Sequence, residues 1–403
     1  MSRTPIGVLL GAESLLGRRS GVGRMTLQIA QATRRDPDIA GLMLSFAGQA
    51  ADPAFLDAIE DVAGGHDRAG LGERLRRWAS HTLAAMPVVP AVRARSVRRH
   101  MNAAARELSA RIGGPVVYHE PNMIAQPFDG VSVVTVNDLS WMLPDRLHPG
   151  SRMSWIERRL PRSLAQATRL VAISEFTARE MVSRLGVGRE RIDVVPLAPS
   201  AEFRPVPDGV ADPVLARHGL RARRFVLSVS TLEPRKNFDR LLAAHASLSA
   251  RTRTAFPLVI AGGRGWGEAL RGKVATDALA AGHLKLLGHV TDADLVTLYS
   301  RAAVFAYPSL YEGFGLPILE AMACGAPVIT SSTTASAETA GGAAVLVDPM
   351  DTQSIARALQ AMVEDHGLSA RFAAVGRDHA RHFTWGRTLS ALAGSWRNAL
   401  GVG

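Results

Sequence analysis

Several residue types are scarce in this chain, and each scarcity excludes a class of protein. The single cysteine, Cys324, excludes an intramolecular disulfide and is typical of a reducing compartment, so we expect a cytoplasmic protein. No stretch approaches the roughly 18 consecutive apolar residues that a membrane-spanning helix needs. The apolar run at residues 6–10 is too short for a signal peptide and predicts a first strand instead.

Arginine outnumbers the acidic residues and lysine, and the formal net charge is +11. Residues 68–111 hold ten arginines against two acids, Glu73 and Glu107. From 93 to 112 apolar residues recur every three or four positions with most arginines off that stripe, which predicts a basic amphipathic helix. Two interpretations stay open: peripheral contact with an anionic membrane through 93–112, or an ordinary solvated helix. Nucleic acid is disfavoured, because aromatic residues are only 5% of the chain and no zinc-ligand spacing accompanies the charge.

Short apolar runs alternate with helical patterns along the chain, which predicts parallel sheets covered by helices. The alternation stops at 196–213, where five prolines and no periodicity indicate a linker, and it restarts at 225. We therefore expect an α/β protein of two Rossmann-like domains, with ligands in the inter-domain cleft at the carboxyl ends of the strands. The expected strands are 5–10, 39–46, 115–118, 131–136, 169–174, 191–196, 225–230, 257–262, 284–288, 304–308, 328–331 and 344–347.

The stretch SLYEGFGLPILEAMACGAPV, residues 309–328, carries the most specific chemistry. It follows an expected strand, turns through Gly313, Phe314 and Gly315, and opens a helix near Leu316. Backbone amides at such a helix start form an anion site suited to phosphate.

Two carboxylates flank that anion site. Glu312 lies in the turn, and Glu320 lies on the helix about one turn past its start. Both can accept hydrogen bonds from hydroxyl groups, and Glu320 is placed to chelate a vicinal diol such as a ribose. A nucleotide sugar, with hydroxyls on both sides of a diphosphate, is the ligand that this arrangement suits.

The spacing Glu312-x7-Glu320 within EGFGLPILEAMACGAPVI resembles the signature of the retaining family 4 glycosyltransferases, which share the two-domain fold called GT-B. STLEPRKN at 230–237 resembles the segment whose basic pair contacts the donor diphosphate, and this chain has just three lysines. AGGRGW at 261–266 resembles the loop that packs on the nucleobase. The resemblance implies that the donor is bound by Arg235, Lys236, Gly263, Glu312, Gly313, Phe314, Gly315, Leu316 and Glu320.

The first half resembles the acceptor-binding domain of the same family. SGVGR at 20–24 resembles a glycine-rich loop whose Gly21 and Gly23 would touch the donor phosphate through backbone amides, with a plain tight turn as the alternative. ISEFT at 173–177 resembles a further element of that domain. The resemblance implies an acceptor domain at 1–200, a donor domain at 201–380, and a terminal helix at 381–403 that crosses back to the first domain.

Two expected strands end in polar segments that point at the cleft, YHEPN at 118–122 and TVNDL at 135–139. Many relatives have a histidine at the position of Asn137, hydrogen-bonded to the donor sugar. Asparagine cannot titrate near neutrality, so histidine acid–base chemistry is not expected there. His119 is a substitute candidate, with a buried structural histidine as the alternative.

We expect neither a metal nor a cofactor. The acidic pair Asp292 and Asp294 directly follows Thr291 at an expected helix start, which favours a capping role over metal binding. The resemblance implies retention of the anomeric configuration by a front-face mechanism, in which Arg235, Lys236 and the helix amides stabilise the leaving diphosphate.

The overall pattern most resembles bacterial mannosyltransferases of O-antigen and exopolysaccharide assembly. This implies GDP-mannose as donor, with UDP-glucose or another UDP-hexose as the alternative, and a lipid-linked saccharide acceptor at the inner membrane face. An oxidoreductase would need a complete dinucleotide fingerprint, and Gly21-x-Gly23 lacks a small third residue at Thr26. A non-catalytic nucleotide- or nucleic-acid-binding protein would explain the charge but gives no role to Glu312 and Glu320.

Overall fold

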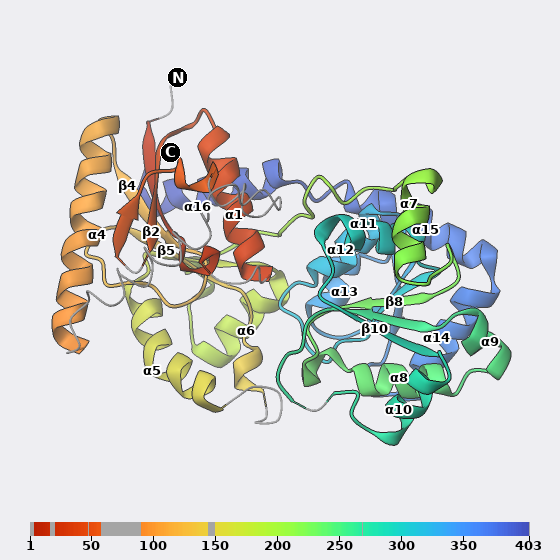
Figure 1. The fold of residues 1–403 in the computed structure, drawn as a ribbon. Coiled ribbons are helices and arrows are strands. Elements are labelled where there is room, and N and C mark those ends of the chain that lie inside the picture. Colours follow the sequence, from red (N-terminus) through yellow and green to blue (C-terminus); the bar gives the residue numbers. More distant parts are fainter. Residues whose placement is uncertain are drawn as a thin grey trace.

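The computed structural model describes residues 4–16, 21–46, 48–57, 90–143, 150–267 and 269–402. In this part of the chain two α/β domains lie side by side, each built on its own sheet (Figure 1). Ser20 of the glycine-rich loop and the arginines at 68–77 lie outside the described residues. The fold is the predicted one of two Rossmann-like domains.

The N-terminal sheet has the strand order β3-β2-β1-β4-β5-β6-β7, with every neighbouring pair parallel except β2 and β3. All six residues of β1 are buried because helices cover both faces of the sheet, whereas the edge strand β3 is partly exposed. The elements are β1 (Ile6–Gly11), α1 (Gly21–Arg35), β2 (Ile39–Phe46), β3 (Gln49–Ala51), α4 (Pro90–Ile112), β4 (Val116–Glu120), β5 (Ser132–Val136), α5 (Gly150–Gln166), β6 (Arg169–Ala172), α6 (Glu175–Leu185) and β7 (Ile192–Val194).

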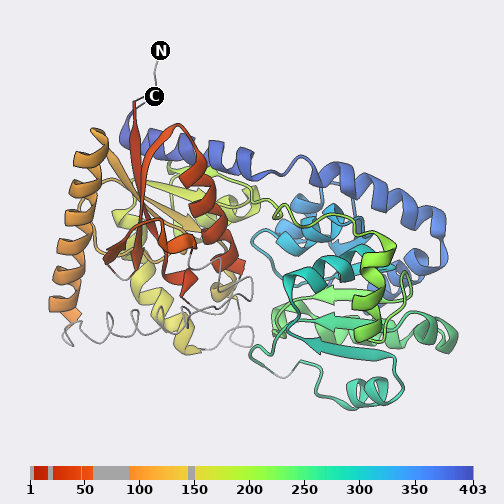
Figure 2. The same ribbon diagram turned by 45° about the horizontal axis from the view of Figure 1, so that its top comes forward.

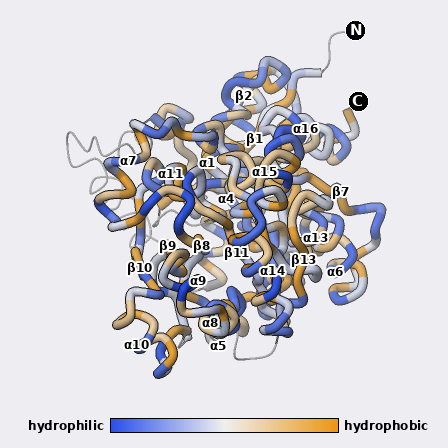
Figure 3. Tube along the Cα trace, turned by 90° about the vertical axis from the view of Figure 1, so that its right-hand side faces the viewer, coloured by the Kyte–Doolittle hydropathy of each residue, from blue (hydrophilic) through white to orange (hydrophobic). Residues whose placement is uncertain are grey.

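The C-terminal sheet is parallel throughout, in the order β10-β9-β8-β11-β12-β13. Figure 3 shows hydrophobic residues along its central strands β8 and β11. The elements are α7 (Asp208–Arg217), β8 (Val226–Val229), α8 (Phe238–Ala246), α9 (Ala250–Ala255), β9 (Leu258–Ala261), α10 (Lys273–Ala280), β10 (Leu284–Gly288), α11 (Asp292–Arg301), β11 (Val304–Tyr307), α12 (Leu316–Ala323), β12 (Val328–Ser331), α13 (Thr334–Ala340), β13 (Val345–Val347), α14 (Thr352–Glu364), α15 (His366–Ala380) and α16 (Trp385–Leu400).

The last helix leaves the second domain and packs on the first (Figure 2). On α16, Trp396 is fully buried, and the Arg397 guanidinium donates to the carbonyls of Thr4 at 2.9 Å and Asp38 at 3.1 Å. Near the start of α16, the Thr388 hydroxyl donates to the Pro196 carbonyl at 2.8 Å. The two domains are therefore joined by α16 as well as by the chain after β7.

Helices α4 and α7 lie where the sequence predicts a basic helix and a linker. The basic helix expected at 93–112 forms as α4, and Val97, Met101 and Leu108 of its apolar stripe are buried against the N-terminal sheet. The linker expected at 196–213 is wrong in its last third, because α7 begins at Asp208 within it. Ala211 and Leu215 of α7 are buried, and packing against α11 supplies the stability that the sequence pattern does not indicate.

Among the described helices none is long and apolar enough to cross a membrane.

Candidate functional site

The basic pair and Glu312 follow neighbouring strands of the C-terminal sheet. The strand order reverses between β8 and β11, and the turn after β8 carries Arg235 and Lys236 while the turn after β11 carries Glu312. Open α/β sheets bind ligands at the carboxyl ends of the strands beside such a reversal. The fold thus brings Glu312 to Arg235 and Lys236, which lie 77 and 76 positions before it in the sequence.

These three side chains form one buried ionic cluster. Lys236 Nζ lies 2.7 Å from Glu312 Oε1, and Arg235 Nη1 lies 3.3 Å from Glu312 Oε2. Lys236 also donates to the Tyr307 hydroxyl at 2.8 Å, and Arg235 Nε donates to Glu233 at 2.9 Å. Lys236 and Glu312 are each only 6% exposed, so their charges depend on one another rather than on water.

The charges of the cluster shift its pKa values. Burial disfavours the Glu312 carboxylate, but the neighbouring Lys236 and Arg235 outweigh burial and lower its pKa to about 2. Burial and the nearby Arg235 lower the pKa of Lys236, whereas the carboxylates of Glu312 and Asp138 raise the pKa of Arg235 against the effect of burial. Glu312 is therefore ionised at neutral pH and can accept hydrogen bonds but donate none.

Residues 313–316 form the predicted turn and helix start beside this cluster. Gly315 has a φ of 93°, a left-handed conformation that favours glycine, and it caps the first turn of α12. Gly313 approaches the other domain so closely that a Cβ there would lie 2.0 Å from the Asn137 carbonyl oxygen. Phe314 is buried, and its ring lies edge-on to Phe383 just before α16.

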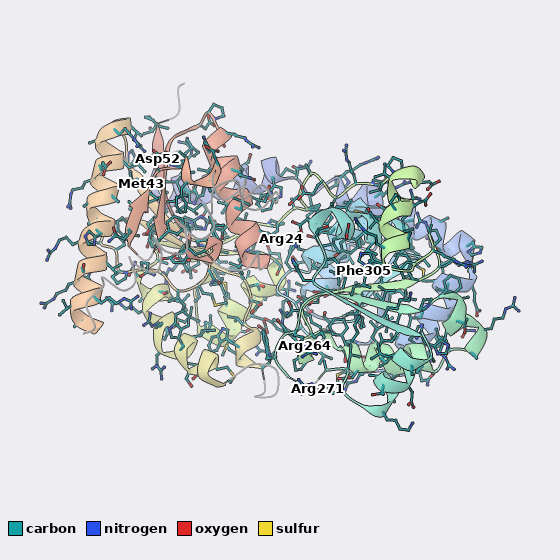
Figure 4. The ribbon with its side chains drawn as sticks, in the orientation of Figure 1. Arg24, Met43, Asp52, Arg264, Arg271 and Phe305 are labelled. Atoms are coloured by element: carbon teal, nitrogen blue, oxygen red, sulfur yellow. The ribbon has the colours of Figure 1, made fainter. Side chains whose placement is uncertain are left out.

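Glu320 on α12 meets an arginine from the opposite domain. Tyr299 donates to Glu320 Oε2 at 3.1 Å, and Arg24 Nη1 lies 3.8 Å from Glu320 Oε1. Burial raises the pKa of Glu320 to about 7, although the charge of Arg24 opposes that rise. Arg24 Nη2 also bonds Asp292 Oδ1 at 2.8 Å, and Figure 4 shows Arg24 at the junction of the two domains. Glu320 can thus exchange a proton near neutral pH at the place where the domains meet.

The acidic pair at the start of α11 serves the helix and two separate ion pairs. Thr291 caps α11 by accepting from the Asp294 amide at 3.1 Å. Asp292 pairs with Arg24, whereas Asp294 pairs with Arg217 at 2.6 Å. The two carboxylates are therefore engaged with different cations.

The two N-terminal candidates lie in different places. Asn137 follows β5 at the domain junction, where its side chain donates to the Pro121 carbonyl at 3.0 Å. His119 on β4 is fully buried within the N-terminal domain, bonded to the Thr135 hydroxyl at 2.8 Å and edge-on to the Trp396 ring. Burial lowers the pKa of His119 to about 3. The structure does not bring His119 to the cluster around Glu312, and its surroundings favour the alternative of a buried structural histidine.

The predicted glycines also differ in their surroundings. Gly21 and Gly23 form the first turn of α1, close in sequence to Arg24. Gly263 has open space around it, with no atom within 4 Å of a Cβ placed there. Its neighbour Gly262 is the constrained one, because a Cβ would lie 1.9 Å from the Ser230 carbonyl oxygen. The close packing of this loop on the turn after β8 therefore depends on Gly262.

Two charged residues at the domain junction were not predicted as site residues, Arg24 and Glu338. The position of Arg24 could have been recognised from the sequence. A cation in the first turn of a helix is disfavoured by the helix dipole, which indicates an acidic partner outside that helix. Glu338 on α13 offers no such signal, since its partners, the Glu175 and Phe176 amides at 2.8 Å each, lie in the other domain.

Comparison with known proteins identifies the family. A family model described as "Glycosyl transferases group 1" matches residues 216–379. The O-antigen chain mannosyltransferase B of Escherichia coli is 35% identical over 269 residues, which cover 67% of this chain and 71% of that protein. The serotype-specific mannosyltransferase WbdA of Escherichia coli is 30% identical over 228 residues, 55% of this chain but 28% of WbdA. The solved structure of Anabaena HepE in complex with UDP has a TM-score of 0.66 at 17% identity, covering 97% of this chain and 99% of that one.

Proposed function

The chain belongs to the group 1 glycosyltransferases, and we propose that it transfers a hexose from GDP-mannose to a lipid-linked or growing saccharide with retention of configuration. The observation that carries this proposal is the buried cluster of Glu312, Lys236 and Arg235 beside the start of α12. The choice of mannose is supported by the names of the similar Escherichia coli enzymes. A UDP-hexose is the alternative donor.

In the proposed reaction the cluster handles the charge of the leaving group. As the bond between the sugar carbon and the diphosphate oxygen breaks, negative charge grows on the diphosphate. Arg235, Lys236 and the amides at 313–316 would stabilise that charge inside a site largely shielded from water. The acceptor hydroxyl would bond the same sugar carbon on the face that the diphosphate leaves, and its proton would pass to the departing oxygen. Glu312 would accept hydrogen bonds from sugar hydroxyls.

Glu320 would hold the ribose of the donor. Its carboxylate lies on α12 about one turn beyond the amides at 313–316, which suits a diol on the nucleoside side of a diphosphate. In the present conformation its partners are Tyr299 and Arg24. We propose neither a metal nor a cofactor, because the basic pair and the helix amides supply the positive charge that the diphosphate needs.

A thermal-shift panel tests the donor. GDP, UDP, ADP, NAD and the sugar conjugates of these nucleotides would be titrated against the wild type and Lys236→Ala. We expect GDP and GDP-mannose to raise the melting temperature of the wild type and to lose most of that effect in Lys236→Ala. Stabilisation by UDP and UDP-glucose alone would move the proposal to the alternative donor. Stabilisation by NAD alone, or by no nucleotide, would overturn it.

We further propose a cytoplasmic enzyme that touches the inner membrane face through the charge of α4. The apolar stripe of α4 is buried in the N-terminal domain, so lipid contact would be electrostatic and would not involve insertion of that stripe. Sedimentation with anionic and neutral vesicles tests this: binding to anionic vesicles alone, lost at high salt, is expected, and equal binding to both contradicts it. The exposed basic residues of α4 are Arg93, Arg95, Arg98, Arg99, Arg106 and Arg111.

A further inference from the structure

The start of α6 in the N-terminal domain forms hydrogen bonds with one carbonyl group of the turn at 313–316. Ser174, the N-cap of α6, donates its hydroxyl to the Gly313 carbonyl at 2.7 Å, and the Thr177 hydroxyl donates to the same oxygen at 3.1 Å. Both side chains are fully buried. One carbonyl oxygen accepts two hydrogen bonds with its two lone pairs, so its direction is fixed from the opposite domain.

Further contacts fix α6 against the C-terminal domain. The Glu338 carboxylate accepts from the Glu175 and Phe176 amides, a favourable place for a negative charge at a helix start. Tyr311 joins the same junction, where its hydroxyl accepts from the Leu139 amide at 3.0 Å and donates to Glu180. We call these residues, 137–139 and 174–180 with 311–314 and Glu338, the inter-domain seam.

Fixing the Gly313 carbonyl also fixes the next amide. The peptide bond between Gly313 and Phe314 is trans, so the Phe314 N–H points opposite to the Gly313 carbonyl and away from α6. Within the described residues no group accepts a hydrogen bond from this amide. The N–H belongs to the turn that leads into α12, where amides are suited to an anion.

We propose that Ser174 and Thr177 are positioning residues that orient the Gly313–Phe314 peptide toward the donor when the two domains meet. This inference rests on the proposed function, because the donor is the ligand of the oriented amide. Both hydroxyls bond the Gly313 carbonyl and are fully buried, so neither is exposed to a ligand. Because both belong to the domain opposite the donor site, the amide is aligned in the closed molecule, and a donor bound to separated domains meets an incomplete site. Closure and charge stabilisation are thereby linked through one peptide group.

The variant Thr177→Val tests this inference, since it removes one hydroxyl at nearly constant volume and keeps the Ser174 cap. Ser174→Ala is a second variant, Thr177→Ser restores the hydroxyl, and Ser183→Ala on the exposed side of α6 is the matched control. GDP release from GDP-mannose gives kcat and KM, and titration of GDP gives its Kd. We expect Thr177→Val to lower kcat about tenfold or more with little change in the Kd of GDP, and Thr177→Ser to recover most of kcat.

Retention of wild-type kcat by Thr177→Val and Ser174→Ala would overturn the inference. A parallel loss of kcat, GDP affinity and melting temperature would also overturn it, since it would indicate a merely structural role. A wild type that releases no nucleotide from any nucleotide sugar would instead refute the proposed function. Hydrogen exchange of the peptide 309–319 then still tests the seam: faster exchange in Thr177→Val than in Ser183→Ala is expected, and equal exchange contradicts it.

Discussion

Gly313→Ala is the perturbation for which the structure predicts the largest effect from the smallest change. Gly313 has no left-handed φ, so its backbone conformation accepts alanine. The added Cβ would lie 2.0 Å from the Asn137 carbonyl oxygen and 2.7 Å from Asp138 Cβ, both in the other domain. Since real Cβ atoms essentially never approach closer than 3.0 Å, the domains must separate locally by at least 1.0 Å. A misplacement of about 1 Å at a reacting site lowers the rate about 10²-fold.

The assay compares Gly313→Ala with the wild type and with Gly209→Ala, a glycine of α7 around which a Cβ meets nothing within 4 Å. We expect Gly313→Ala to release GDP from GDP-mannose about 10²-fold more slowly. Its melting temperature and its affinity for GDP should stay close to those of Gly209→Ala, because the clash involves the other domain. Wild-type turnover in Gly313→Ala would refute the reasoning, since the seam would then be dispensable for catalysis. A large fall in melting temperature would instead show that the contact between the domains stabilises the fold, so that the loss of turnover would not be specific to catalysis.

Three further results are expected. The pKa of Glu320 is raised to about 7, and only the ionised form can accept from both hydroxyls of a ribose diol with its two oxygens. GDP affinity measured by calorimetry should therefore fall as the pH drops below 7. Glu320→Gln should bind GDP more weakly and lose the pH dependence that comes from Glu320, whereas the titration of GDP itself affects both proteins. Identical pH profiles of the wild type and Glu320→Gln would contradict the role of Glu320 in holding the ribose. His119→Gln should keep kcat and its pH profile, because His119 is buried and neutral with a pKa of about 3; a lost pH limb would make it a catalytic group. Trp396→Ala should lower the free energy of unfolding by about 3–5 kcal/mol in a denaturant titration, because Trp396 is fully buried. Replacement of the exposed Trp155 by alanine, the control, should lower it by about 0.5 kcal/mol or less. Equal effects would show that α16 does not stabilise the N-terminal domain.

The C-terminal elements were predictable because local signals agree with the fold. The helix Asp292–Arg301 begins where the sequence indicates, because the N-cap Thr291 marks its start. The strand Leu284–Gly288 has the bounds that its short apolar run indicates. We did not predict helix α7, because Pro213 lies inside it and its apolar residues recur over too few positions to indicate a helix. Its stability comes from tertiary packing, which a local pattern does not record.

The cluster around Glu312 was predictable for a different reason. The expected strands at 225–230 and 304–308 end just before Arg235, Lys236 and Glu312, and the resemblance to the glycosyltransferases assigns all three residues to the donor. The sheet order then shows that these two strands are neighbours. The inter-domain seam could not be predicted in this way. Its contacts, such as Ser174 with Gly313, depend on how two separately folded domains approach one another, and no local spacing encodes that approach.

The most direct test of the account is the turnover of GDP-mannose by Glu312→Gln compared with the wild type. The substitution keeps the shape of the side chain but removes the charge that pairs with Lys236 and Arg235. We expect the wild type to release GDP and to transfer mannose. We expect Glu312→Gln to turn over at least about 10²-fold more slowly while still binding GDP. Wild-type turnover in Glu312→Gln, or a wild type that neither binds nor uses any nucleotide sugar, would contradict the central claim.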